Sequence, residues 1–161
     1  MTTNPYSPPR ARIADTPEGE GNSPIWNPNA AANWSLLFSP AFGAFVHMLN
    51  WRTLGEDAKA ASAKAWFIAS LLILGFYVVL GFAVPNANAA DAASRAIGLT
   101  FLIVWYFAAA RGQAKYVNEK LGKTYLRKGW TKPLLIALLA LVGYFVLIVA
   151  IAFLFGVVQQ A

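Results

Sequence analysis

The sequence predicts an all-α integral membrane protein with three transmembrane helices, preceded by a short helix that is interfacial or half-inserted. Of the 161 residues, 58% are hydrophobic and 12% are charged, whereas soluble domains carry roughly 25% charged residues. Residues 65–84 and 134–158 contain no Asp, Glu, Lys, Arg or His, and about 20 apolar residues suffice to cross a bilayer. A soluble core is excluded because so short a chain lacks the polar surface to enclose such helices.

The N-terminal residues 1–33 are predicted to form a flexible tail. They are rich in Pro, Gly and Asn, so they cannot bury enough apolar area to offset the entropy cost of ordering. They also lack the apolar core and cleavage site of a secretory signal. The segment "NPYSPPR" suits a peptide-binding groove, and a leader without a partner is the alternative. The helical membrane domain is expected to occupy residues 34–161.

A short helix is expected over residues 40–54. Ser39 followed by Pro40 is a helix-start signal, and Gly55 followed by two acidic residues marks the end of one helix and the start of another. At ~1.5 Å per residue this helix is roughly 22 Å long, short of the ~30 Å hydrocarbon core. The alternative is a crossing from Ala32 to Trp51, because spanning helices tolerate proline. That alternative gives four transmembrane helices and places the tail outside.

Three spans are expected to follow, at about residues 64–84, 93–110 and 134–158. The middle span requires Arg95 to extend its side chain toward the headgroups. The helical pattern continues beyond this span, so the same helix is expected to stop only at Gly122. Its apolar positions in that continuation are Ala110, Ala114, Val117 and Leu121.

The loop at residues 111–133 determines the predicted orientation. It carries seven basic residues against the single acid Glu119, so its net charge of +6 equals that of the whole chain. Short loops rich in Lys and Arg stay in the cytoplasm, so the tail is expected there too and the C-terminus in the periplasm. A basic soluble protein would suggest a nucleic-acid partner, but this juxtamembrane location predicts none. The residues expected to contact lipid headgroups, which attract nearby cations, are Lys115, Lys120, Lys123, Arg127, Lys128 and Lys132.

The candidate polar site consists of His47, Asn50 and Arg52. His47 and Asn50 lie three residues apart on one face of the short helix, where histidine could act as an acid or base near neutral pH. The favoured alternative is a histidine hydrogen-bonded to a neighbouring carbonyl or headgroup, because no second base or nucleophile accompanies it. With no cysteine and few other ligands, the sequence predicts no metal, no cofactor and no enzyme activity.

Two sequence blocks carry a resemblance, "NPYSPPRARIAD" at residues 4–15 and "NWSLLFSPAFGAFVHMLNWRTLG" at residues 33–55. An Asn-Pro-Tyr leader followed by a Phe-x-Pro…Asn-Trp-Arg-x-Leu-Gly block resembles small, functionally uncharacterised multi-pass inner-membrane proteins of proteobacteria. The resemblance covers residues 4–85 by motif and the remainder by hydropathy. It implies a location in the bacterial inner (cytoplasmic) membrane, and it implies no reaction or ligand.

The expected function is therefore non-catalytic binding of another membrane protein, as an accessory subunit or as a protective or regulatory factor, together with contact to membrane lipids. One alternative is self-association into an oligomeric pore or permeability factor. A second alternative is a membrane redox or lipid enzyme that uses His47. The charge-free cores of the spans favour the first hypothesis, because transport paths usually keep ionisable residues inside the membrane.

Overall fold

The computed structural model describes residues 23–160, and side chains for residues 23–156. Its elements are α1 (Pro28–Phe38), α2 (Pro40–Thr53), α3 (Asp57–Ala83), α4 (Ala87–Trp105), the π-helical turn η1 (Tyr106–Ala110), α5 (Arg111–Lys120) and α6 (Thr131–Gln160). No β-strand occurs within this described part. Three of its helical stretches, Asp57–Ala83, Ala87–Lys120 and Thr131–Gly156, are long and apolar enough to cross a membrane. The predicted all-α membrane fold is confirmed.

Helix α1 begins inside the segment that the sequence assigns to the flexible tail. The side chain of Asn27 accepts hydrogen bonds from the backbone N–H groups of Asn29, at 3.0 Å, and Ala30, at 3.3 Å, and Pro28 occupies the first turn. This N-cap satisfies donors that have no partner within the helix. The tail boundary at residue 33 is therefore corrected, because residues 23–33 belong to the folded domain. Residues 1–22, including "NPYSPPR", lie outside the described residues.

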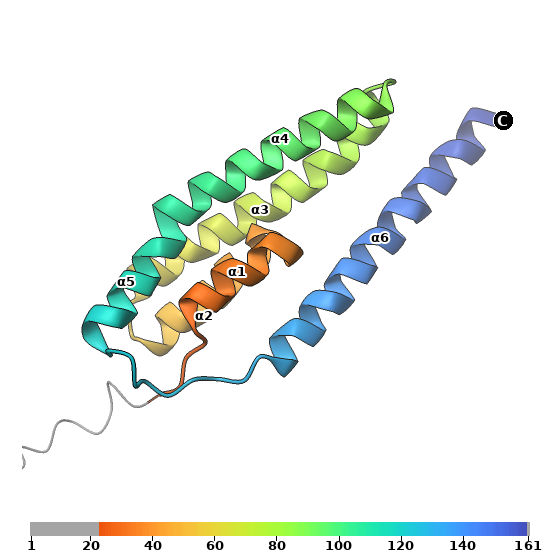
Figure 1. Cartoon of the computed structure of the whole chain (residues 1–161). Coiled ribbons are helices and arrows are strands. Elements are labelled where there is room, and N and C mark those ends of the chain that lie inside the picture. Colours follow the sequence, from red (N-terminus) through yellow and green to blue (C-terminus); the bar gives the residue numbers. More distant parts are fainter. Residues whose placement is uncertain (1–22, 161) are drawn as a thin grey trace, which may run out of the picture.

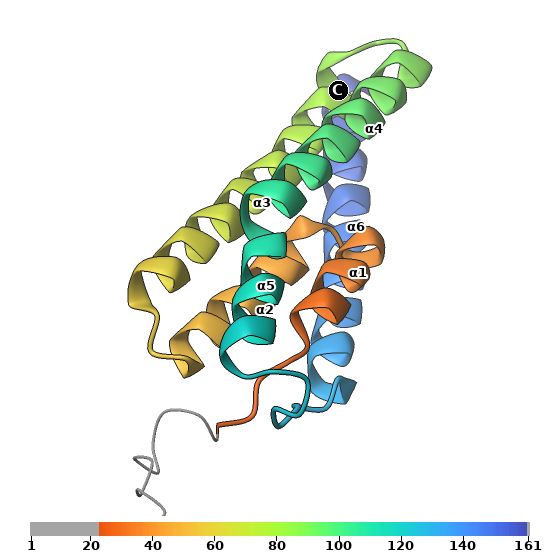
Figure 2. The ribbon, with the colours of Figure 1, turned by 60° about the vertical axis from the view of Figure 1, so that its left-hand side comes forward.

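Helices α1 and α2 form an antiparallel hairpin, with the chain reversing at Ser39 (Figures 1 and 2). With 11 and 14 residues, the two helices are only about 16 and 21 Å long, so neither reaches across a bilayer. The alternative of a single crossing from Ala32 to Trp51 is wrong, because the φ of 85° at Ser39 breaks the helix. The hairpin apex thus lies near the middle of the long helices, and its base lies where α3 begins.

The turn from α2 to α3 is closed by Gly55, as expected. Gly55 has a φ of 72°, its N–H donates to the carbonyl of Arg52 and the N–H of Glu56 donates to the carbonyl of Trp51. This pattern is a Schellman motif, which satisfies carbonyls at a helix end. Helix α3 then starts at Asp57, seven residues before the predicted span.

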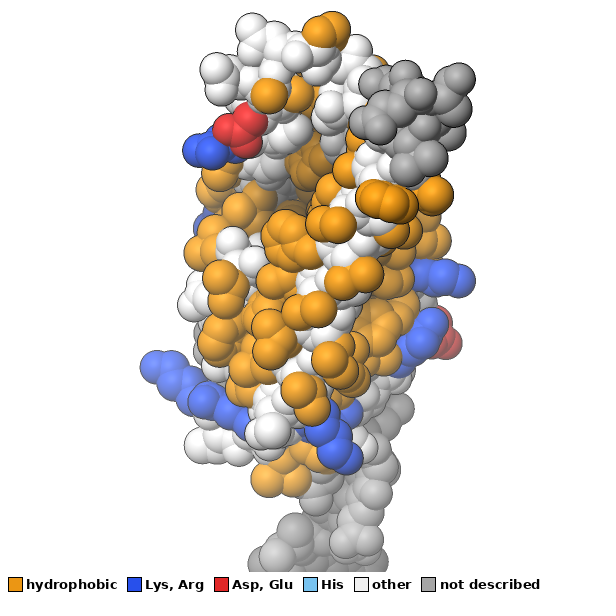
Figure 3. All heavy atoms as spheres, turned by 90° about the vertical axis from the view of Figure 1, so that its right-hand side faces the viewer, with side chains coloured by type: hydrophobic (Ala, Val, Ile, Leu, Met, Phe, Trp, Pro, Cys, Tyr) orange, Lys and Arg blue, Asp and Glu red, His pale blue; other side chains and the backbone are white. Residues whose placement is uncertain are grey.

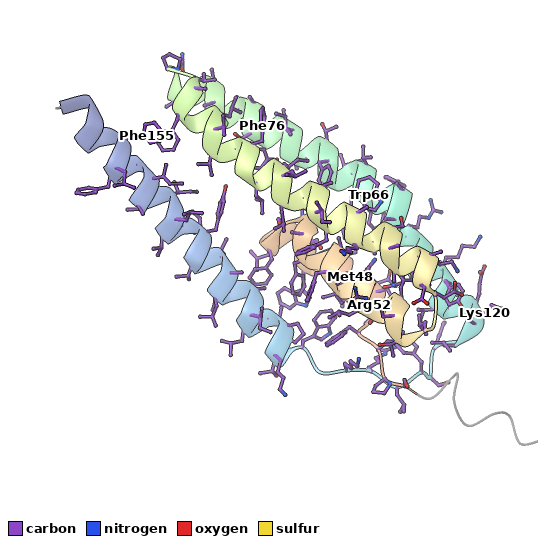
Figure 4. The ribbon with its side chains drawn as sticks, turned by 180° about the vertical axis from the view of Figure 1, so that it is seen from behind. Met48, Arg52, Trp66, Phe76, Lys120 and Phe155 are labelled. Carbon is purple, nitrogen blue, oxygen red and sulfur yellow. The ribbon has the colours of Figure 1, made fainter. Side chains whose placement is uncertain are left out.

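The second long helix runs without interruption through α4, η1 and α5, and Gly122 follows it with a φ of 69°. The predicted loop at residues 111–133 is consequently helical as far as Lys120. We call the end of the molecule that holds α5, the connection 121–130 and the start of α6 the basic end. Figure 4 shows Lys120 at this end and Phe155 at the opposite one.

Buried side chains gather in α2, whereas the long helices are largely exposed. The buried residues of α2 are Ala41, Gly43, Ala44, Val46, His47, Met48, Asn50 and Trp51. Gly43 permits this packing, since a Cβ there would overlap Ser35 Oγ and the Trp105 ring. The hairpin is therefore the packed core of the fold, and the long helices surround it as expected of lipid-facing elements.

Helix α6 stands apart from α3 and α4 over much of its length (Figure 1). Near its start Trp130 lies 6.3 Å from Phe42 between ring centroids, and near its middle the Tyr144 hydroxyl donates to the carbonyl of Leu74 at 2.9 Å. Near its end, Phe155 stacks on a ring of α3 at 5.0 Å. In the most apolar continuous stretch of 18 residues within α6 no residue is buried, and Ala137 is the one buried residue among 131–156. Apolar side chains cover most of the face that α6 presents (Figure 3).

Candidate functional site

Asn50 holds the residues that precede α1. The backbone N–H of Trp26 donates to Asn50 Oδ1 at 2.9 Å, and Asn50 Nδ2 donates back to the carbonyl of Trp26 at 2.8 Å. The side chain amide thus pairs with Trp26 as a neighbouring β-strand would. We call Ile25–Asn27 the N-terminal strap, because it crosses the base of the hairpin at the basic end (Figure 2).

The other edge of the N-terminal strap pairs with the connection between α5 and α6. The N–H of Ile25 donates to the carbonyl of Leu126 at 3.1 Å, and the N–H of Lys128 donates to the carbonyl of Ile25 at 2.9 Å. The indole N–H of Trp26 donates to the carbonyl of Gly129 at 3.0 Å, and Lys128 Nζ lies 4.4 Å from the centroid of the Trp26 ring. The strap therefore joins α2 to the connection that leads into α6.

Gln113 extends the polar cluster to α5. Asn50 Nδ2 donates to Gln113 Oε1 at 3.1 Å, and Gln113 Nε2 donates to the carbonyl of His47 at 2.9 Å. Both Asn50 and Gln113 are fully buried, so each bond satisfies a group that water cannot reach. Gln113 was not among the predicted site residues, although its place in the sequence signals burial. Gln113 lies three residues after Ala110 and four before Val117 on the apolar face of a helical pattern.

His47 is a buried, neutral member of this cluster. Its Nε2 lies 3.2 Å from the carbonyl oxygen of Pro28, and its ring centroid lies 5.7 Å from that of Trp105. Burial lowers the pKa of His47 from 6.5 to about 4, against the smaller opposing effect of the Pro28 carbonyl. Because a carbonyl only accepts, the neutral ring carries its proton on Nε2. The histidine thereby links α2 to the start of α1.

The third member of the candidate polar site does not join the other two. Arg52 is exposed, and Figure 4 shows it on α2 near the basic end. The residues expected to contact headgroups all lie at the basic end, where every one is exposed except Lys128, which is half-buried against Trp26. Lys115 pairs loosely with Glu119 at 3.8 Å, and Arg127 Nη2 donates to the carbonyl of Lys123 at 3.4 Å.

A cavity of about 420 Å³ lies between α2, α3 and the η1–α5 segment. Its inner wall is formed by the large ring of Trp105, by the small side chains of Ala108 and Ala109, and by His47. Toward the basic end its lining includes Lys59, Lys115, Tyr116 and Glu119. We call this space the basal cavity. Its wall contains π-helical backbone, which is frequent at functional sites.

Glu56 and Lys59 shape the region beside the basal cavity. The hydroxyl of Tyr116 donates to Glu56 Oε1 at 2.5 Å, and Lys59 Nζ lies 3.0 Å from Glu56 Oε2. These two contacts, with the Tyr116 bond the larger, lower the pKa of Glu56 below its ordinary value. Lys59 Nζ also lies 4.1 Å from the centroid of the Tyr116 ring and 4.9 Å from that of Trp51. This network joins the start of α3 to α5.

A smaller cavity, of about 210 Å³, lies at the apex of the hairpin against α3 and α4. Ser39 lines it, and its buried Oγ has no hydrogen-bond partner among residues 23–160. The φ of 85° and ψ of 160° at Ser39 fall in a region that is essentially restricted to glycine. The apex therefore combines backbone strain with an unsatisfied hydroxyl.

Among the described residues 23–160, no group of three or more His, Asp or Glu side chains lies close enough together to hold a metal ion. No family model, curated protein or solved structure matches this chain.

Proposed function

We propose that this protein is a non-catalytic membrane protein that binds a transmembrane helix of another membrane protein along α6, as an accessory subunit or as a protective or regulatory factor. The observation that carries the proposal is the exposure of α6 in the described chain. Helices in lipid associate by close van der Waals packing rather than by a hydrophobic driving force. Helix α6 instead touches its own neighbours through a few long side chains.

The surface of α6 supports a helix as the occupant. Ala140 and Gly143 make a shallow stretch, flanked by the exposed side chains of Leu139, Val146 and Leu147. A Cβ at Gly143 would meet no described atom within 4 Å. Small residues of this kind let a second backbone approach closely.

The buried polar groups support a non-catalytic role. Asn50 and Gln113 each use their side chains to hold backbone or one another, and His47 is 2% exposed. These bonds connect α1, α2, α5 and the N-terminal strap, which is a structural use of polar groups.

We also propose that the membrane is the bacterial inner membrane, with the basic end and the N-terminal tail in the cytoplasm and the C-terminus in the periplasm. The concentration of Lys and Arg at the basic end supports this orientation. The α1–α2 hairpin then enters the membrane from the cytoplasmic side and returns. Leu36 and Leu37, which are 73% and 65% exposed on α1, suit contact with lipid there.

Photo-crosslinking tests the proposed partner. A photoreactive amino acid at Val146 on α6, which is 62% exposed, is expected to capture one heterologous membrane protein in cells. The same probe at Leu99 on α4, which is 61% exposed, is the matched control and should not capture it. The captured protein should co-purify in mild detergent, and Gly143→Phe should lower its recovery about tenfold by blocking close approach. Gly75→Phe on α3 is the control, because its Cβ also meets no described atom within 4 Å.

Two results would overturn this assignment. Crosslinks from Val146 to lipid alone would show that no partner helix binds α6, and crosslinks only to a second copy of the chain would favour the oligomeric alternative.

The orientation has a separate test, since the chain lacks cysteine and single cysteines can be introduced. Lys123→Cys should react with an impermeant thiol reagent only in inverted vesicles, and Asn88→Cys only in intact spheroplasts. The reverse pattern refutes the orientation.

A further inference from the structure

We infer that the basal cavity binds one phospholipid whose headgroup carries both a phosphate and a primary amine. This goes beyond the proposed function, since it concerns α2, α3 and α5 rather than α6. The cavity's volume of about 420 Å³ lies within the ~300–1,000 Å³ range of small-molecule sites. In this inference the headgroup and the first methylenes of the acyl chains enter the cavity, and the rest of the lipid stays outside.

The lining changes in polarity along the axis of the molecule in the same direction as a phospholipid at a membrane surface. Trp105 and Glu119, which both line the cavity, are 14 residues apart on one helical stretch, or about 21 Å. Near Trp105 the wall consists of Ala108, Ala109 and the buried, uncharged His47, and near Glu119 it becomes charged. An amphipathic ligand would place its apolar part inward and its charged part at the basic end.

Both signs of charge line the charged part of the basal cavity. Lys115 supplies an ammonium group, and Lys59 supplies a second one that also pairs with Glu56 Oε2 at 3.0 Å. Ammonium groups bind phosphate oxygens through charge-assisted hydrogen bonds. Glu119 supplies a carboxylate, and its 3.8 Å separation from Lys115 leaves the pair open to rearrangement. A purely anionic headgroup would place negative charge beside Glu119, whereas a primary amine gives this carboxylate a partner. The mixed lining therefore favours an aminophospholipid over an acidic phospholipid.

Gly112 offers a way to fill this cavity without disturbing the packing around it. Gly112 lines the cavity, and a Cβ there would meet no described atom within 4 Å. A phenylalanine ring at this position occupies the space where the lipid would sit. Gly75→Phe is the matched control, since Gly75 is also an exposed helical glycine with open space around its Cβ position, but it does not line the cavity.

The experiment titrates the purified full chain in detergent with dioleoyl phosphatidylethanolamine or dioleoyl phosphatidylglycerol and counts bound lipids by native mass spectrometry. The wild-type chain is expected to bind one phosphatidylethanolamine about tenfold more tightly than phosphatidylglycerol, the size of one charge-assisted contact. Gly112→Phe should abolish this binding, and Gly75→Phe should retain it. Equal affinities for the two lipids in the wild-type chain, or unchanged binding by Gly112→Phe, would overturn the inference.

Two exposed substitutions keep the test valid where Gly112→Phe fails to fold. The side chains of Lys115 and Glu119 are 74% and 60% exposed, so neither substitution removes buried packing. Lys115→Gln should weaken binding of both lipids, because both contain phosphate. Glu119→Gln should remove the preference for phosphatidylethanolamine, because only that lipid contains an amine. Lys132→Gln is the control for charge at the basic end, and an equal effect of all three substitutions would refute a specific site.

Discussion

Replacing Asn50 by leucine removes the side chain that joins the N-terminal strap to α2 and α5 while nearly preserving its volume. Three hydrogen bonds are lost, two to the backbone of Trp26 and one to Gln113 Oε1. The oxygen of Gln113 is left buried without this donor, which costs about 1–3 kcal/mol. Trp26 is only partly buried, so its two backbone groups recover some hydration and cost about 0.5–1 kcal/mol each. We expect a total loss of about 3 kcal/mol in the free energy of unfolding.

The assay is equilibrium unfolding in mixed micelles of dodecyl sulfate and dodecyl maltoside, combined with amide hydrogen exchange. The amide of Trp26 donates to Asn50 in the wild-type chain, so its exchange protection should fall in Asn50→Leu. Asn118→Leu, at an exposed position on α5, is the matched control and should change stability by no more than about 0.5 kcal/mol. A loss below about 1 kcal/mol in Asn50→Leu, with unchanged protection at Trp26, would refute the role assigned to Asn50.

A double-mutant cycle separates the hydrogen bond between Asn50 and Gln113 from the other destabilising effects of each substitution. Gln113→Leu alone removes the bond to Asn50 and the bond to the carbonyl of His47. With both side chains replaced, the bond between them is counted once rather than twice. The double variant should therefore lose less stability than the sum of the single variants, by about 1 kcal/mol. Additive losses would mean that Asn50 and Gln113 do not share a hydrogen bond.

Three further predictions concern the hairpin. Gly43→Ala should destabilise the protein by about 1–3 kcal/mol, because the new methyl group overlaps Ser35 and Trp105. Unfolding in mixed micelles measures this change, and an unchanged free energy of unfolding would contradict the close packing at Gly43. Ser39→Gly should instead raise stability by about 1 kcal/mol in the same assay, since glycine adopts the observed φ of 85° without strain. A loss of stability in this variant would contradict the backbone strain assigned to Ser39. Because the folded pKa of His47 is lowered to about 4, the unfolded chain takes up a proton first as pH falls. Stability should therefore be constant above about pH 6.5 and fall by up to about 3 kcal/mol toward pH 4. His47→Gln should remove that part of the slope, and an unchanged pH profile in this variant would contradict a buried neutral histidine.

The candidate site shows where sequence reasoning stops. The sequence placed His47 and Asn50 on one helix face and favoured a histidine bound to a neighbouring carbonyl or to a headgroup. In the structure Nε2 lies beside the carbonyl of Pro28, which is 19 residues away in sequence. The sequence also grouped Arg52 with them because of proximity in sequence, but Arg52 lies on the exposed side of α2. It did not single out Gln113, although the place of Gln113 on the apolar face of a helical pattern signals burial. The hydrogen-bond partner of Gln113 leaves no local pattern, because Asn50 is 63 residues away.

The sequence by itself determined that the chain is helical, that it has three stretches able to cross a membrane, and that its net charge gathers between the second and third of them. These properties depend on composition and on neighbours within a few residues, including the turn glycines Gly55 and Gly122. Only the tertiary structure decided that α1 and α2 fold back as a hairpin and that the N-terminal strap lies between α2 and the connection to α6. Ser39 has a side chain that opposes the reversal, so contacts between distant segments, such as Gly43 against Trp105, must stabilise it.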